Sequence, residues 1–219
     1  MQMGIGRLAK TLASVCFPRA IVVRGRADFP PLIAVTFDDG PHVENTPRIL
    51  DVLESHNVQA TFFLQGDLAS RSPALVREID RRGHDIGNHG YAHIDAKSVP
   101  TSVYVADVLK AQAQLEHILG RKLPRYFRPP FGNVTAASTL ALLREQFRFV
   151  FWSYDSRDSF LPDQSMLVQH LTDSEIHAGT ILLFHDDYSQ TSAALPEMLT
   201  ILRSRGLRMV PLREIIKLP

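Results

Sequence analysis

The chain of 219 residues is 45% hydrophobic and 21% charged, a composition that allows a sizeable core and excludes disorder, collagen and coiled coil. Its 24 basic residues nearly balance its 23 acidic residues, so no basic excess indicates nucleic acid or an anionic membrane as a partner. A single cysteine excludes an internal disulfide, and no Cys-x-x-Cys pair is present for redox or zinc chemistry.

The first 28 residues are predicted to form an arm outside the folded domain. Basic residues precede a short apolar run at residues 12–17, but arginines interrupt the chain beyond it, so the sustained apolar segment of a secretory signal is lacking. No stretch approaches the ~18 consecutive apolar residues that a membrane crossing needs. These features predict a cytoplasmic protein, with the inner membrane face as an alternative if residues 8–17 form a peripheral helix. A solvated arm is the simpler interpretation.

Beyond residue 30, short runs rich in aromatic and β-branched residues alternate with helical patterns. Capping residues and proline mark helix starts, as in Thr46-Pro47 and Ser72-Pro73, and glycine marks an end at Gly83. In chain order we predict a strand at 32–37, a helix from 46, a strand at 60–65, a helix at 72–83, a strand at 85–88, a helix at 102–119, a strand at 125–128, a helix at 135–145, a strand at 148–152, a helix at 163–177, a strand at 180–185, a helix at 192–205 and a strand at 207–210.

This alternation of strand and helix predicts a single α/β domain over residues 29–219, with a parallel sheet and helices outside it. Two closures are compatible with the pattern, an open doubly wound sheet and a barrel. In both, ligands bind at the carboxyl ends of the strands. Polar residues at those ends are therefore the candidates for a functional site.

Two strand ends carry groups that can bind a metal. Asp38 and Asp39 follow the first strand, where adjacent carboxylates are costly to bury unless they are paired, protonated or bound to a cation. An ordinary Asp-Gly-Pro turn is an equal alternative for them. His89 and His93 follow the third strand, and a spacing of four lets two imidazoles bind one metal, although two surface histidines would show the same spacing.

Three other strand ends carry groups suited to orienting a substrate or moving a proton. Arg128 can orient a carboxylate, and the Pro-Pro turn after it exposes the backbone N–H of Phe131. Asp155 can hold a histidine in one tautomer. His185 follows four apolar residues at the rim of a core, where it can act as a general acid or base or serve only as a hydrogen-bonded rim residue.

On a parallel scaffold these five groups converge on one cleft. One aspartate and two histidines form a three-ligand site with an open position, which is the pattern of catalytic rather than structural zinc. The remaining aspartates, the arginine and the third histidine supply the other parts for metal-assisted hydrolysis.

The same segments resemble the five motifs of the polysaccharide deacetylases, carbohydrate esterase family 4. They are 36–41 (TFDDGP), 89–93, 128–132 (RPPFG), 152–158 and 183–185, and they follow the family order over nearly the whole chain. The resemblance implies a distorted (β/α)7 barrel. It also implies a metal-dependent hydrolase that removes N-acetyl groups from an acetylated amino-sugar polymer, oligosaccharide or glycolipid by attack of a metal-bound water.

The resemblance implies roles for residues that bind the metal and the substrate. Asp39, His89 and His93 would bind the metal, expected to be Zn²⁺, with Co²⁺, Mn²⁺ or Ni²⁺ able to replace it. The backbone N–H of Phe131 would stabilise the oxyanion, and Trp152 would lie against the acetylated carbohydrate.

The resemblance also implies a proton-transfer set. Asp38 would be the general base, oriented by Arg128. His185 would be the general acid that protonates the leaving amine, and Asp155 would hold its ring.

Three positions depart from the family pattern. Gly90 stands where the family has Ser or Thr after the first metal histidine, and glycine gives up the hydroxyl that braces this loop. Ser159 stands where a Trp is usual, and Phe160 after it is expected to fill part of the same groove. Phe131 replaces a commoner Tyr, a change that matters little if the backbone N–H is the group that stabilises the oxyanion.

Other functions remain open at this stage. An O-acetyl esterase acting on xylan needs the same tetrahedral intermediate, so the motifs do not separate it from an N-deacetylase. A catalytically silent carbohydrate-binding member of the fold is a further alternative, against which the retained base and acid argue. A phosphohydrolase should carry a second metal site or a basic phosphate cradle, and neither is evident.

Overall fold

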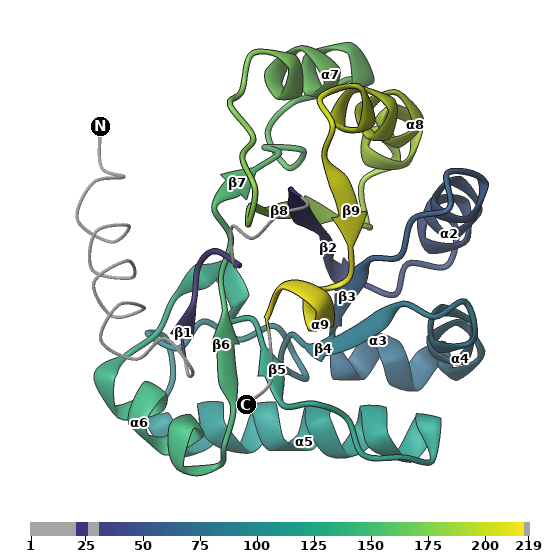
Figure 1. Ribbon diagram of the computed structural model, residues 1–219. Coiled ribbons are helices and arrows are strands. Elements are labelled where there is room, and N and C mark those ends of the chain that lie inside the picture. The colour runs from purple at the N-terminus through teal and green to yellow at the C-terminus, as the bar shows by residue number, and fades with distance from the viewer. Residues whose placement is uncertain (1–20, 26–30, 217–219) are drawn as a thin grey trace.

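The computed structural model describes residues 21–25 and 31–216, whose strands form one parallel sheet curled into a distorted barrel (Figure 1). The strands are β1 (Ile21–Val22), β2 (Leu32–Gly40), β3 (Thr61–Leu64), β4 (Asp85–Asn88), β5 (Tyr126–Phe127), β6 (Arg148–Val150), β7 (Tyr154–Asp155), β8 (Ile181–His185) and β9 (Arg208–Val210). Their order in the sheet is β1-β6-β5-β4-β3-β2-β8-β7, and β9 pairs with the start of β2. The barrel, rather than the open doubly wound sheet, is therefore the closure that the chain adopts.

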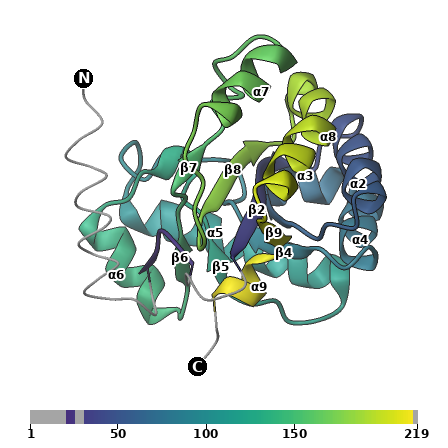
Figure 2. The same ribbon diagram turned by 45° about the horizontal axis from the view of Figure 1, so that its top comes forward.

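Helices cover the outside of the strands (Figure 1). They are α2 (Asn45–Ser55), α3 (Gly66–Arg71), α4 (Pro73–Arg81), α5 (Thr101–Leu119), α6 (Ala136–Arg144), α7 (Gln164–Thr172), α8 (Ser189–Ser204) and α9 (Leu212–Ile215), with a single 3-10 turn, η1, at Pro130–Gly132. Figure 2 shows α2 and α4 together on one side of the barrel and α6 on the opposite side. No helix of the described residues is long and apolar enough to cross a membrane.

The central strand β2 divides its side chains between two cores. Ile33, Val35 and Phe37 pack outward against the helices, with the ring of Phe37 stacked 5.0 Å from that of Phe62. Ala34 belongs to the apolar core inside the barrel. Successive side chains of a strand point to opposite faces, so the alternation carries Asp38 to the inner face at the carboxyl end of the strand.

Helix α9 closes the end of the barrel opposite that carboxyl edge. Leu212 and Ile215 are almost fully buried in the inner core. The backbone N–H of Leu212 donates to the Oγ1 atom of Thr61 at 2.9 Å, at the first residue of β3. Helix α9 therefore fills this end of the barrel with packed apolar side chains.

The predicted N-terminal arm needs a correction at its end. Residues 1–20 and 26–28 of that segment, including the predicted peripheral helix, lie outside the described residues. Ile21 and Val22, however, form β1 and pair with Phe149 and Val150 of β6. Both are more than 90% buried, so burial places them in the domain rather than in an arm.

Candidate active site

A fully buried arginine holds the carboxylate of Asp38 inside the barrel. Arg128, which follows β5, is 0% exposed, and its Nη1 donates to Oδ1 of Asp38 at 2.8 Å and to Oγ1 of Thr36 at 2.7 Å. Its other N–H groups donate to the backbone oxygens of Val150 and Phe151. Burial lowers the pKa of Arg128, and Asp38 opposes that shift. The guanidinium is thus fixed from several sides, and it fixes one oxygen of the carboxylate.

The end of β2 leaves regular strand geometry at Asp39. Its φ is 68°, in the left-handed region, and the pairing of β2 with β3 shifts register between Phe37 and Gly40. In a regular strand Asp38 and Asp39 would point to opposite faces. The irregularity brings both carboxylates to one cleft, as the sequence analysis required.

Asp39, His89 and His93 form a group that can hold a metal ion, with one ligand atom from each lying within 4.8 Å of the others. Oδ1 of Asp39 lies 3.4 Å from Nε2 of His89 and 3.1 Å from Nε2 of His93. Ligands in a tetrahedral zinc site, bound at about 2.0–2.1 Å, are separated by about 3.3 Å. The donor atoms therefore fit a single zinc-sized cation.

Neighbouring groups orient His89 and keep Asp39 ionised, and both effects favour binding of a cation. Nδ1 of His89 lies 2.7 Å from the carbonyl oxygen of Arg128, which can only accept, so Nδ1 carries a proton and Nε2 is the nitrogen that faces the metal group. Burial raises the pKa of Asp39, but hydrogen bonds and charge interactions with His89 and His93 outweigh burial and lower that pKa far below its usual value.

The metal-binding loop is braced by an aspartate that the sequence analysis did not identify. The φ of Gly90 is 79°, so the loop does use glycine's conformational freedom. Asp107 of α5 accepts the backbone N–H groups of Tyr91 at 2.7 Å and Ala92 at 3.0 Å. Asn88 accepts the N–H of Gly90 itself at 2.8 Å. These side chains support the loop in the absence of a hydroxyl at position 90.

His185, at the end of β8, faces the same cleft from the other side. Its Nδ1 lies 2.6 Å from Oδ1 of Asp158, and its Nε2 lies 4.0 Å from Oδ2 of Asp39. Asp158 is fully buried and also accepts the backbone N–H of His185 at 2.7 Å and the hydroxyl of Thr191 at 2.8 Å. Burial lowers the pKa of His185, but Asp158, together with Asp38 and Asp39, outweighs burial and raises it to about 9.

The prediction that Asp155 holds His185 is therefore wrong, and Asp158 is the residue in contact with the ring. Asp155 pairs with Leu183 in the sheet, and its carboxylate accepts the backbone N–H of Arg157 at 2.9 Å. The chain then turns through Arg157, whose φ is 59°. That turn brings Asp158 back against His185. Without knowledge of the turn, the sequence could not show whether Asp155 or Asp158 contacts the imidazole.

The two predicted substrate-contacting residues lie beside these groups. Phe131, in η1, has a φ of 58°, is 64% exposed, and sets its ring edge-on to His93 with a centroid separation of 4.6 Å. The ring of Trp152 lies 5.8 Å from Cζ of Arg128. Phe160 is 81% exposed and does not line the cavity described next, and its place in a substrate groove stays a prediction.

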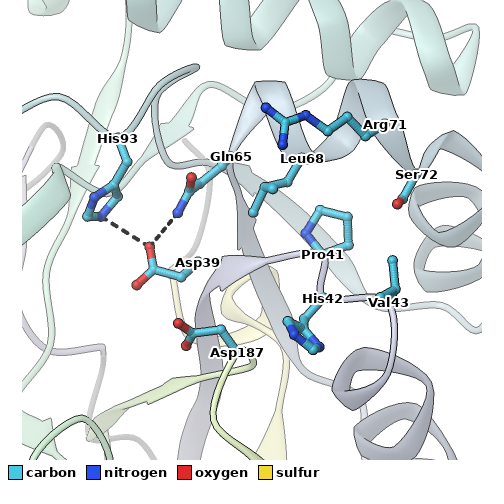
Figure 3. Close-up of a pocket in the computed structure, with 10 residues that line it drawn as sticks. All are labelled: Asp39, Pro41, His42, Val43, Gln65, Leu68, Arg71, Ser72, His93 and Asp187. Atoms are coloured by element: carbon cyan, nitrogen blue, oxygen red, sulfur yellow. Dashed lines mark hydrogen bonds and ion pairs between the residues drawn. The ribbon is translucent and has the colours of Figure 1, made fainter.

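A cavity of about 470 Å³ opens next to Asp39 and His93 (Figure 3). Its wall is formed by the end of β2 and the loop after it, by α3 and the residues around it, by His93, and by the second residue after His185: Asp39, Pro41, His42, Val43, Gln65, Leu68, Arg71, Ser72, His93 and Asp187. Gln65 was not among the predicted site residues, although its Nε2 donates to Oδ1 of Asp39 at 2.8 Å. Its position as the last residue of the second predicted strand was the available signal.

Comparison with known proteins shows which family the chain belongs to. The family model for polysaccharide deacetylases matches residues 26–150, and the chain belongs to that family. It is 36% identical to a peptidoglycan-N-acetylglucosamine deacetylase of Bacillus cereus, over 85% of this chain and 88% of the relative. It is 34% identical to a chitooligosaccharide deacetylase of Azorhizobium caulinodans, over 82% of this chain and 92% of the relative.

A solved structure agrees with the fold. The crystal structure of a peptidoglycan N-acetylglucosamine deacetylase in complex with an N-hydroxybenzamide compound superposes with a TM-score of 0.86 at 31% identity, over 94% of this chain and 96% of that one. The predicted (β/α)7 barrel is thereby confirmed. His185 and Asp158 lie beyond the segment that the family model matches, so their place in the site comes from the geometry above.

Proposed function

We propose that this protein is a metal-dependent hydrolase that removes N-acetyl groups from an acetylated amino-sugar polymer or oligosaccharide. One observation carries the proposal. A three-ligand metal group lies between a carboxylate held by Arg128 on one side and an imidazole held by Asp158 on the other. The names of the two relatives favour an N-acetyl amide over an O-acetyl ester as the bond that is cleaved.

Zn²⁺ is the metal that suits this donor set best, because one carboxylate and two imidazoles leave a coordination position open in tetrahedral geometry. Asp39, His89 and His93 would hold it, and Co²⁺, Mn²⁺ or Ni²⁺ can replace it in vitro. When bound, the metal would polarise the scissile carbonyl and acidify water.

Asp38 is suited to act as the general base. Arg128 occupies its Oδ1, which leaves Oδ2, 3.9 Å from Nε2 of His89, directed at the metal group. Asp38 takes a proton from the attacking water as the water oxygen bonds to the amide carbon. The backbone N–H of Phe131 donates a hydrogen bond to the carbonyl oxygen as it becomes negatively charged.

His185 is suited to act as the general acid. With Nδ1–H directed at Asp158, the proton on Nε2 points into the cleft, and the raised pKa of His185, about 9, keeps it there at neutral pH. His185 donates this proton to the amide nitrogen as the C–N bond breaks. The products are a free amine and acetic acid, which releases its proton to solvent and becomes acetate, and the proton taken by Asp38 balances the one lost from His185.

The location and the exact carbohydrate stay predictions. A cytoplasmic location, with the inner membrane face as its alternative, was inferred from residues that lie outside the described part of the chain. An O-acetyl esterase and a catalytically silent carbohydrate-binding protein remain the competing functions.

The deciding experiment measures acetate release from N-acetylglucosamine oligomers, peptidoglycan and acetylated xylan, with added zinc and with a chelator. Release from the amino-sugar substrates that the chelator abolishes and zinc restores supports the proposal. Release from xylan alone would favour the esterase. One bound metal per chain without release from any substrate would favour the silent protein.

A further inference from the structure

The strand β3 contributes a polar side chain to the metal group through the residue that directly follows it. Gln65 caps the start of α3, and its backbone N–H donates to the carbonyl oxygen of Gly40 at 2.9 Å. Its own carbonyl accepts the N–H of Ala69 in the first turn of the helix, also at 2.9 Å. The backbone of Gln65 is therefore fixed to the same strand end that carries Asp39.

The side-chain amide of Gln65 reaches the oxygen that faces both histidines. Its Nε2 lies 2.8 Å from Oδ1 of Asp39, and Figure 3 shows this contact together with the contact from His93. The contacts of Gln65, His89 and His93 with this carboxylate all meet at Oδ1. The contact thus singles out one of the two carboxylate oxygens.

We infer that Gln65 is a positioning residue that holds Asp39 in the orientation needed to bind the metal. A carboxylate oxygen offers two lone-pair directions, so Oδ1 can accept from Gln65 through one and bind a cation through the other. Without that donor the carboxylate can rotate about its last side-chain bond, and Asp39, whose backbone is in the left-handed region, lies where the pairing of β2 with β3 shifts register.

The chemistry of an amide fits this task. An amide donates a hydrogen bond without neutralising the carboxylate, whereas a lysine or arginine there would compete with the metal for its charge. A glutamate would repel Asp39 or become a further ligand. Hydrogen-bond partners of metal ligands typically change metal affinity or activity by about 10–100-fold when removed.

The inference rests on the proposed metal site, so it is tested by metal binding rather than by turnover alone. The zinc dissociation constant of the metal-free protein is measured by competition with a chromophoric chelator. We compare the wild-type protein with Gln65→Leu, which keeps the bulk of the side chain and removes the donor. Arg71→Met serves as the matched control, because Arg71 lines the same cavity and pairs with Asp67 instead of Asp39.

We expect the dissociation constant to rise about 10–100-fold in Gln65→Leu and to stay within about twofold in Arg71→Met. The visible spectrum of the Co²⁺-substituted protein should change in the first variant only, which a purely structural role would not produce. Gln65→Ala provides a second donor-free variant should the leucine protein fold poorly, as thermal unfolding of the metal-free forms will show.

An unchanged dissociation constant in a folded donor-free variant would overturn the role of Gln65 while leaving the proposed function intact. Failure of the wild-type protein to bind zinc or cobalt would overturn both. A weakening in Arg71→Met equal to that in Gln65→Leu would also overturn the inference, because the effect would then belong to the cavity in general.

Discussion

The two sides of the candidate site are built differently. The metal-binding side is made of two pairs, each close together in sequence: Asp39 lies next to the base Asp38 at the end of β2, and His89 and His93 lie four residues apart after β4. The proton-donating side joins the end of β8 to a turn 27 residues earlier in the chain. Local spacing specifies the first side, whereas the second depends on how one turn folds.

The largest expected effects separate metal binding from proton transfer. His89→Ala removes a metal ligand and should abolish both bound metal and acetate release. Asp38→Asn keeps the metal ligands and should lower kcat/KM by about 10²–10⁴-fold, the usual contribution of a general base. Metal content and acetate release, measured on the same samples, check both. Normal turnover in the Asp38 variant would remove that residue from its assigned role.

The next effect tests which aspartate supports the general acid. Asp158→Asn takes away the charge that raises the pKa of His185 to about 9, so that pKa should fall. The protonated imidazole is the active form, and activity is lost as pH rises through the pKa. The alkaline limb of the kcat/KM profile should therefore move to lower pH, with a loss of about 10²-fold at neutral pH.

Asp155→Asn is the matched control for that measurement. Its carboxylate contacts the N–H of Arg157 and not His185, so both the profile and the rate should stay close to those of the wild-type protein. A shifted alkaline limb in this variant, with an unshifted one in Asp158→Asn, would restore the assignment that the structure overturned.

A smaller effect is expected from Gly90→Ser on the metal-binding side. The new Cβ would lie 3.0 Å from a carboxylate oxygen of Asp107, and φ at this position is +79°. A non-glycine residue held in such a conformation costs about 1–3 kcal/mol. Metal affinity should fall several-fold, as a zinc titration would show, even though serine is common at this position in the family. Unchanged affinity would mean that the loop adopts another path.

The smallest effect is expected from Thr191→Val on the proton-donating side. The substitution removes one of the hydrogen bonds to Oδ2 of Asp158, and the backbone N–H of His185 still donates to the same oxygen. The free energy of unfolding should fall by about 1 kcal/mol. Chemical denaturation measures that loss, and kcat/KM should change by less than in Asp158→Asn.

Sequence patterns predicted the parts of the fold that are long or repeated. Apolar runs located seven strands, β2 to β6, β8 and β9, and the N-cap of α4 lies at Ser72 as expected. The two-residue strand β5 lies within a predicted strand between two helical patterns, but β1 and β7, which are equally short, were not predicted. Pairing with neighbours that are distant in sequence defines them instead.

For the site, too, only the residues with a clear sequence signal were predicted. Charged residues at strand ends indicated Asp38, Asp39, His89 and His185, since parallel strands bring their carboxyl ends together. Gln65 was missed because an uncharged amide gives no signal of its own. Asp158 was missed because the left-handed turn at Arg157 decides which carboxylate reaches the imidazole, and no pattern of residue types encodes that turn.

Arg128 contacts both the general base and a metal ligand, through two different parts of the same residue. Its guanidinium holds Asp38, while its peptide carbonyl holds the ring of His89. Every amino acid has that carbonyl, so substitution at this position can disable only the first contact. The histidine contact is thus hidden from side-chain mutagenesis and from natural sequence variation, and it would be revealed only by altering the peptide carbonyl itself, for example by replacing its oxygen with sulfur.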